Sequence, residues 1–249
     1  MRKVLAIPVI AGLVQLASAE TITVPAEAES IQEAIDLAQG DDVILVEPGR
    51  YNETINFKGK AITVKSTKGA AVTTIDGWSL NDSVVKCISG EGPSTIFDGF
   101  TVTGGTGNQE LYSDTETVGG GLLCLHSSPS IKNCIFVSNT STYQGGAIFN
   151  GDRSNPTIQN CKIRSNTSER GGGVYNSRGR PVIRDTEIAN NTTEYGGGGM
   201  YNFGSNVRII SCTLKHNRAQ YNGGGVYDYD SGGRAEDCVF TDNIAMFNG

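Results

Sequence analysis

The sequence predicts an all-β fold, a right-handed parallel β-helix that stacks coils of about 26 residues with three short strands each. Glycine-rich triplets recur every 26 residues along the second half of the chain. Within each repeat, short apolar runs alternate with turn residues, and equivalent positions of successive repeats carry the same kind of side chain. A fixed period of this length is the signature of a stacked repeat architecture. The triplets begin at Gly119, Gly145, Gly171, Gly197 and Gly223, and Gly249 stands where a sixth begins.

The first residues have the pattern of a Sec-type signal peptide. Arg2 and Lys3 form a basic segment, residues 4–16 are mostly apolar, and Ala17-Ser18-Ala19 has the small residues of a cleavage site. We therefore assign 1–19 to a signal peptide cleaved after Ala19, and 20–249 to a single β-helix domain. No other stretch is long and apolar enough to span a bilayer. The sequence predicts a secreted or cell-surface protein.

One helix is expected near the start of the domain. Ser30 and Glu33 have the spacing of a capping box. Apolar residues follow at helical spacing over 31–38, and Gly40 is placed to end the helix. The open end of a stacked repeat exposes an apolar cross-section, so we expect this helix to cover it.

Residues 20–118 are expected to contain this capping helix and a set of irregular coils. A polar, glycine-containing insertion over 104–117 separates them from the regular repeats. Short apolar runs bounded by turn residues predict the strands. These runs lie at 21–24, 43–46, 51–57, 61–65, 72–75, 84–85, 95–97 and 100–102.

Residues 119–249 are expected to form the regular coils, in which equivalent positions line up as columns. An aliphatic column faces the core and contains Leu122, Ile148, Val174, Met200 and Val226. The next column faces outward if the strand alternates, and it contains Leu123, Phe149, Tyr175, Tyr201 and Tyr227. A third column is asparagine in all five coils, at Asn139, Asn166, Asn191, Asn217 and Asn243. An amide at every coil predicts a ladder of side-chain hydrogen bonds along the stack.

Four of the six cysteines, Cys134, Cys161, Cys212 and Cys238, share an inward column. Adjacent coils lie about 4.8 Å apart, which is within reach of a disulfide. Parallel Cβ vectors place the sulfurs awkwardly, however, so the pattern favours buried free thiols, with disulfides as the alternative.

The charge balance limits the partners. Removing Arg2 and Lys3 leaves 18 basic residues against 26 acidic ones, a net charge near −8. This balance argues against nucleic acids and anionic membranes. It is compatible with neutral glycans, and with acidic glycans held through a cation.

Two stretches resemble known families. Gly145-Gly146-Ala147-Ile148, with Phe136-Val137-Ser138-Asn139 and Phe240-Thr241-Asp242-Asn243, resembles the polymorphic outer membrane protein repeat over 119–249. That resemblance implies a β-helical surface protein used in adhesion. The segments 30–35 and 46–51 are similar to the opening coil of the pectin lyase-like superfamily. That superfamily includes pectinolytic lyases, esterases and epimerases as well as non-catalytic members.

The aromatic columns predict a binding or adhesion module for glycans or surface partners. Flat aromatic faces beside amides suit sugar rings or partner proteins. The alternative is that the rings only shield the glycine-rich turns. The predicted ligand-binding residues are Tyr175, Tyr201, Tyr227, Asn176, Asn202 and Asp228, and a second aromatic row contains Tyr143, Tyr195, Tyr221 and Phe247.

A polysaccharide-active enzyme, whether a lyase, a hydrolase or an epimerase, is the alternative function. A lyase needs an acidic cluster that holds calcium and a basic residue near the sugar, for which Asp228, Asp230 and Arg234 are the candidates. A hydrolase needs two facing carboxylates, and Asp185 and Asp237 share a column two coils apart. Calcium is expected only in the lyase case, and otherwise the sequence predicts no cofactor or metal.

The last residue opens another coil. We therefore expect either further coils after it or end-to-end association through the open edge.

Overall fold

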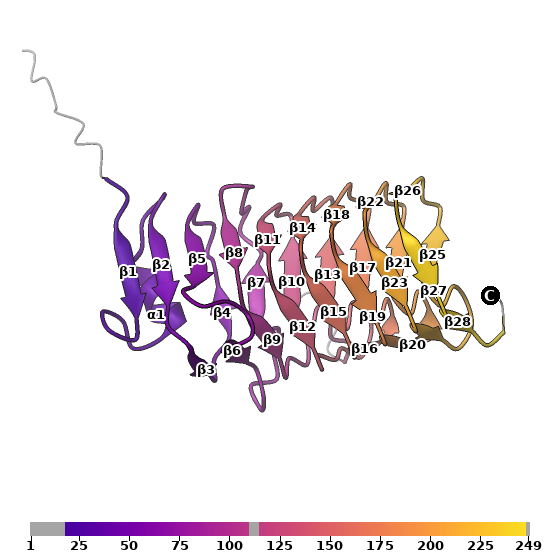
Figure 1. Cartoon of the computed structure of the whole chain (residues 1–249), viewed down its shortest axis with the longest axis horizontal. Coiled ribbons are helices and arrows are strands. Elements are labelled where there is room, and N and C mark those ends of the chain that lie inside the picture. Colours follow the sequence, from indigo (N-terminus) through magenta and orange to yellow (C-terminus); the bar gives the residue numbers. More distant parts are fainter. Residues whose placement is uncertain (1–17, 110–114, 248–249) are drawn as a thin grey trace, which may run out of the picture.

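A computed structural model describes residues 18–109 and 115–247. The described chain winds into one elongated parallel β-helix, with α1 near one end and β25 to β28 at the other (Figure 1). Residues 1–17 of the predicted signal peptide lie outside the described residues. Within the described chain, no helix has the length and apolar character needed to cross a membrane.

Four sheets run along the stack. Every strand pair within them is parallel over the described chain, and one pair, between two strands of sheet D, shifts its register at a β-bulge. Sheet A contains β1 (Thr21–Val24), β2 (Val43–Val46), β5 (Thr63–Ser66), β8 (Ile96–Asp98), β11 (Ser130–Lys132), β14 (Thr157–Gln159), β18 (Val182–Arg184), β22 (Arg208–Ile210) and β26 (Arg234–Glu236). Sheet B contains β3 (Gly49–Tyr51), β6 (Thr73–Asp76), β9 (Thr101–Thr103), β12 (Ile135–Val137), β15 (Lys162–Arg164), β19 (Glu187–Ala189), β23 (Thr213–Lys215) and β27 (Val239–Thr241). Sheet C contains β4 (Ile55–Asn56), β7 (Val85–Cys87), β10 (Leu122–Leu125), β13 (Ile148–Gly151), β17 (Val174–Ser177), β21 (Met200–Phe203) and β25 (Val226–Tyr229). Sheet D contains β16 (Thr167–Arg170), β20 (Thr192–Gly196), β24 (Arg218–Ala219) and β28 (Ile244–Ala245).

The three predicted strands are present in the regular coils, and sheet D adds a fourth short one from residue 167 onward. One boundary prediction is wrong. The single strand expected over 51–57 is broken into β3 in sheet B and β4 in sheet C, because the chain turns a corner at 52–54. Ile55 and Phe57 nevertheless share the buried face, as alternation requires.

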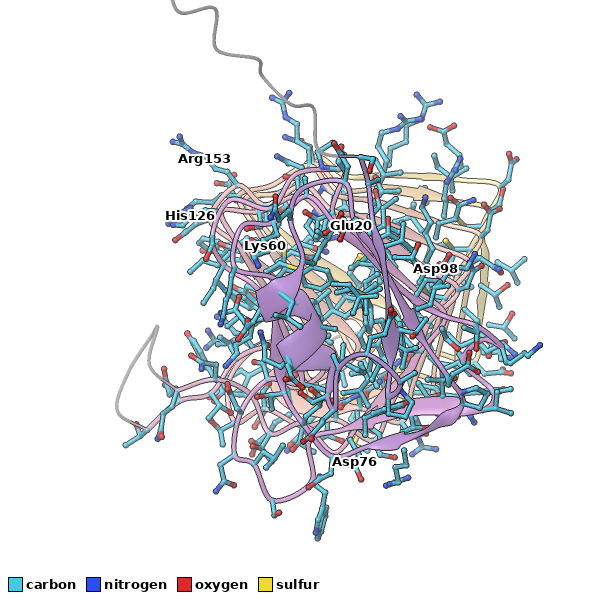
Figure 2. The ribbon with its side chains drawn as sticks, turned by 90° about the vertical axis from the view of Figure 1, so that its left-hand side faces the viewer. Glu20, Lys60, Asp76, Asp98, His126 and Arg153 are labelled. Carbon is cyan, nitrogen blue, oxygen red and sulfur yellow. The ribbon has the colours of Figure 1, made fainter. Side chains whose placement is uncertain are left out.

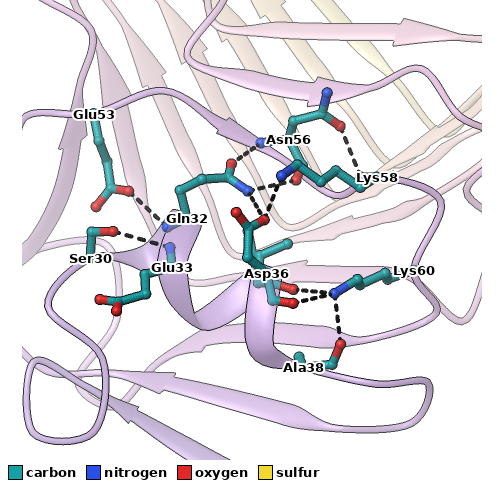
Figure 3. Close-up of polar contacts among 10 residues, drawn as sticks. Ser30, Gln32, Glu33, Asp36, Ala38, Glu53, Asn56, Lys58 and Lys60 are labelled. Atoms are coloured by element: carbon teal, nitrogen blue, oxygen red, sulfur yellow. Dashed lines mark hydrogen bonds and ion pairs between the residues drawn. The ribbon is translucent and has the colours of Figure 1, made fainter.

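The predicted capping helix is α1 (Ile31–Leu37), which lies across the end of the stack (Figure 2). Ser30 is the N-cap, and its side chain accepts from the backbone N–H of Glu33 at 3.1 Å. The Glu53 carboxylate accepts from the first two backbone N–H groups of the helix. These are Ile31, at 3.0 Å, and Gln32, at 2.8 Å, the second of which is drawn in Figure 3. The helix ends at Leu37, earlier than expected from the glycine at position 40.

Lys60 takes the place of a glycine cap at the other end of the helix. Its ammonium donates to the backbone carbonyls of Ile35, Asp36 and Ala38 at 2.7, 2.9 and 2.7 Å (Figure 3). These carbonyls have no partner inside the helix. Side chains from the adjacent coil therefore form hydrogen bonds with both ends of α1.

Two glycines illustrate why the triplets are required. Gly171 has φ of 66°, which other residues adopt only at a cost. At Gly198, a Cβ atom would lie 2.5 Å from the carbonyl oxygen of Gly224 in the next coil and 2.6 Å from that of Arg218. The triplet thus allows backbones of successive coils to approach where sheet D turns into sheet C.

The structure contains the predicted asparagine ladder. Each side-chain amide donates to the amide oxygen of the next coil. The donor–acceptor distances are 3.2 Å from Asn139 to Asn166, 3.0 Å from Asn166 to Asn191, 3.0 Å from Asn191 to Asn217 and 2.9 Å from Asn217 to Asn243. The same oxygens also accept backbone N–H groups, so the ladder satisfies main chain at the corner before sheet D.

All six cysteines are free thiols in the structure. Burial raises the pKa of Cys124 to about 12 and that of Cys212 to about 11. These thiols act as small apolar side chains of the core.

Candidate functional site

The outward column of sheet C forms the floor of a groove. Phe149, Tyr175 and Tyr201 stack along the coil axis, with ring centroids 5.6 and 5.1 Å apart. Tyr227 continues the row and meets Tyr201 edge to face, with centroids 5.0 Å apart. Tyr175 is only 4% exposed, while Tyr201 and Tyr227 are half-buried. The row is therefore outside the core but more shielded than the sequence suggests, because a second apolar cluster around Val118 and Leu123 covers its first members.

Two further aromatic rows flank this floor. On the sheet D side, ring centroids are 5.7 Å apart for Tyr195 and Tyr221, and 5.4 Å apart for Tyr221 and Phe247. On the other side, Phe203 stacks on Tyr229 at 5.6 Å. The groove between the rows has a volume of about 450 Å³. Its lining includes Tyr143, Arg170, Tyr175, Tyr201, Tyr227 and Arg178.

One coil breaks the regular repeat at both rims of this groove. The ladder asparagine and the following glycine triplet are six residues apart in the other coils but five apart between Asn166 and Gly171. The same coil has one extra residue on its other side, where Asp152 and Arg153 both adopt left-handed φ angles of 41° and 66°. Irregular backbone of this kind concentrates at functional sites.

The missing residue removes one aromatic ring from the sheet D wall. Arg170 lies there instead, with its guanidinium carbon 5.1 Å from the Tyr143 ring centroid and 5.2 Å from that of Tyr195. Arg170 also donates to the Tyr143 hydroxyl at 2.9 Å and lies 3.5 Å from the Glu169 carboxylate. Burial lowers the pKa of Arg170, but Tyr143, Glu169, Tyr201 and Tyr175 together outweigh it, so that pKa is above its ordinary value. Burial raises the pKa of Tyr201, which keeps this phenol neutral.

The opposite rim carries a second set of charged side chains. Asp152 and Arg178 both line the groove, and the Arg178 guanidinium lies 5.5 Å from the Phe203 ring centroid. The His126 ring nitrogen is 4.0 Å from the Asp152 carboxylate, and both side chains are partly exposed. Figure 2 shows His126 and Arg153 at the same edge of the molecule.

Two predicted ligand-binding residues must be corrected. Asn176 and Asn202 are buried, because the alternation that turns Tyr175 outward turns them inward. They form a second amide ladder that runs from Asn150 through both of them to the Asp228 carboxylate, with donor–acceptor distances of 2.8, 2.8 and 2.7 Å. A ligand in the groove cannot reach these amides, and Asp228 is the terminal acceptor of the ladder.

The predicted lyase residues are not brought together. Arg234 belongs to sheet A and pairs with Glu236 at 3.1 Å, whereas Asp230 lies at a corner with φ of 50°. Within the described part of the chain, no group of three or more His, Cys, Asp or Glu side chains is arranged to hold a metal ion. Asp185 and Asp237, the predicted hydrolase pair, are also corner residues with φ of 51° and 52°.

The charges of the chain are unevenly distributed. Residues 20–118 contain 6 basic and 16 acidic residues, whereas residues 119–249 contain 12 basic and 10 acidic ones. The groove lies in the second half, and its charged lining residues are Arg170, Arg178 and Asp152. The net negative charge of the whole chain therefore does not argue against an acidic ligand at this site.

Sequence reasoning missed Arg170, Arg178 and Asp152. The signal was present: the spacing from asparagine to glycine changes only in the coil that contains Arg170 and Asp152. A comparison that looks only for similar residues in each column overlooks the one coil that differs.

Comparison with known proteins identifies the fold. Residues 120–249 match the family model described as "Right handed beta helix region". No curated protein matches the chain. Among solved structures, a pectin methylesterase from carrot has a TM-score of 0.60 at 12% identity, covering 92% of this chain and 85% of its own. The Aspergillus niger pectin methylesterase has a TM-score of 0.51 at 13% identity, covering 92% and 87%. The Yersinia enterocolitica enzyme has a TM-score of 0.50 at 12% identity, covering 85% and 90%.

Proposed function

The chain belongs to the right-handed β-helix family, and on that premise we propose that it is an exported protein that binds an extended polysaccharide in the aromatic groove of sheet C. The observation that carries the proposal is the groove itself, with a tyrosine floor between two aromatic walls. The rings repeat once per coil along the axis. A ligand that contacts several of these rings must be extended and repetitive, and a glycan chain has these properties.

The tyrosines suit a sugar ligand for a physical reason. Tyr175 and Tyr201 stack face to face at 5.1 Å, so a ligand in the groove meets mainly ring edges, and each phenol adds a group that can hydrogen-bond to sugar hydroxyls. Tyr201 and Tyr227 are half-buried, so the ring positions are set before a ligand arrives. The three structural neighbours are pectin methylesterases, which makes pectin-type polymers the first ligands to test. These neighbours favour a polysaccharide-directed role over the adhesion role.

A binding screen tests this proposal. The mature chain is titrated with polygalacturonate, methyl-esterified pectin and a neutral glucan, and binding is measured by calorimetry. We expect binding to at least one polymer and a loss of about tenfold or more in the Tyr201→Ala variant. Failure of the folded chain to bind any extended polysaccharide would contradict the proposal.

Hydrolysis of the bound polymer is the second candidate function. The fold similarity to esterases and the Asp152–His126 pair at the groove rim favour it. In that case His126 would act as general base and Asp152 would orient it. Release of methanol or new chain ends by the wild-type chain, and its loss in Asp152→Asn, would establish catalysis. Binding without turnover would support the binding function and contradict hydrolysis.

A further inference from the structure

We propose that Arg170 is the specificity-determining residue of the groove and that it binds one acidic group of the ligand. The inference rests on the proposed polysaccharide-binding function and adds to it the charge of the ligand and the place where that charge is recognised. It starts from the missing residue between Asn166 and Gly171, which leaves a position in the aromatic wall without a ring.

The wall is continuous apart from this position. Tyr143 comes from the coil before, and Tyr195 and Tyr221 come from the two coils after. The β-bulge in the pairing of β16 with β20 compensates for the missing residue and leaves Tyr195 beside Arg170. The guanidinium thus lies between two aromatic rings, at 5.1 and 5.2 Å from their centroids.

This arrangement restrains the guanidinium at the wall of the groove. The Tyr143 and Tyr195 rings both attract it by cation–π interaction. The hydrogen bond from Arg170 to the Tyr143 hydroxyl restrains the rotation of the guanidinium. The Glu169 carboxylate lies 3.5 Å from it. The side chain is still 31% exposed and lines the groove. A planar group held in this way can bind a carboxylate through two parallel N–H groups, which a flexible lysine cannot do as well.

The neighbouring positions of the same column are a glycine and an asparagine. Arg170 pairs in register with Gly196, and Gly196 pairs with Asn222. The Tyr227 ring and Asn222 pack closely beside Gly196, and Arg170 and Asn222 both line the groove. A sugar that lies along Tyr201 in the groove can place a carboxylate at the exposed part of Arg170. We infer that the groove selects a polymer that carries carboxylates over an uncharged polymer of the same backbone.

The test compares two forms of one polymer, polygalacturonate and the same polymer fully methyl-esterified, by calorimetry at fixed ionic strength. We expect the wild type to bind the acidic form more tightly. Arg170→Gln is expected to lose about tenfold or more of that affinity and to leave the esterified form unchanged. Arg170→Lys is expected to recover only part of the affinity, because it keeps the charge but lacks the planar donors. Arg164→Gln, an exposed arginine on sheet B, is the matched control and should change neither affinity.

The outcomes separate the two proposals. If Arg170→Gln weakens both forms equally, or weakens neither while Tyr201→Ala weakens both, the carboxylate subsite is wrong and the polysaccharide groove stands. If the wild type binds neither form, the proposed function fails and the subsite with it. Equal thermal unfolding midpoints of the variants show that the comparison concerns binding, since Arg170 contacts two rings of the wall.

Discussion

The two halves of the molecule reach one fold by different means. In residues 119–249 similar side chains recur at equivalent positions of most coils, so asparagine ladders and aromatic rows extend along the axis. In residues 20–118 the coils are held by individual contacts, such as Glu53 and Lys60 at the ends of α1 and the ion pair of Arg50 with Asp76. Repetition yields surfaces with a regular spacing, and a ligand with its own repeat can match them. The irregular half is suited to closing the end of the stack.

The most disruptive change is expected at the glycine triplets. Gly198→Ala places a Cβ atom 2.5 Å from a carbonyl oxygen of the next coil, and no flexible side chain can yield there. We expect the free energy of unfolding, measured by urea denaturation, to fall by about 3 kcal/mol. In the irregular half, a Cβ atom on Gly40 meets nothing within 4 Å, so Gly40→Ala is the control and should change stability little. An equal loss of stability in the two variants would mean that close backbone packing does not require glycine in the triplets.

The asparagine ladder gives the next largest effect. Asn191→Leu fills the space but leaves the buried backbone N–H of Asn166 without its acceptor, and removes one of the three acceptors of the Asn166 side-chain amide. Leaving this buried donor unpaired should lower the unfolding free energy by about 2 to 3 kcal/mol. Thr192→Ala, at the adjacent exposed residue, serves as the control. A loss below about 0.5 kcal/mol in Asn191→Leu would show that the ladder is not a source of stability.

A smaller and more local effect is expected in the irregular half. Lys60→Met removes the ammonium that binds three carbonyls at the end of α1, at a cost of about 1 kcal/mol. Because the contacts of this half are individual, the loss should stay local. Amide hydrogen exchange should become faster over 31–38 and remain unchanged in the regular coils. Faster exchange along the whole chain would remove the distinction between the halves.

The smallest expected effect is a change in stability with pH. The backbone amides of Gln39 and Glu20 donate to the buried Asp42 carboxylate and lower its pKa. A group whose pKa is lower in the folded state stabilises the fold above its unfolded pKa of about 3.9, and that stabilisation is lost as the pH falls through the folded value. Asp42→Asn should therefore be less stable than the wild type at neutral pH, and the difference should shrink in acid. Thermal unfolding at several pH values measures it, and a difference independent of pH would contradict the assignment.

The fold could be predicted from the sequence because the residues that determine it recur in every regular coil. Glycine triplets, an inward aliphatic column and asparagine at one corner recur five times, so one interpretation of a coil explains the others. The break of the strand expected over 51–57 could not be predicted, since no neighbouring repeat defines where that coil turns. Periodicity is most informative where copies can be compared.

The site was harder to predict for two reasons. Asn176 and Asn202 were expected to flank the tyrosines, yet strand alternation turns every second side chain to the other face. Arg170 departs from the repeat, and its position between Tyr143 and Tyr195 depends on the bulge in sheet D, which no propensity indicates. The groove was thus predictable in its aromatic rows and unpredictable in the residues that give it charge.

The binding of polygalacturonate to two alanine variants tests the central claim most directly. Tyr201 lies on the groove floor in the regular half, and Trp78 is a largely exposed aromatic residue in the irregular half. If the repeated rows bind the polymer, Tyr201→Ala should lose about tenfold or more in affinity, and Trp78→Ala should bind like the wild type. A loss in Trp78→Ala with none in Tyr201→Ala would place the ligand outside the regular half and contradict the account.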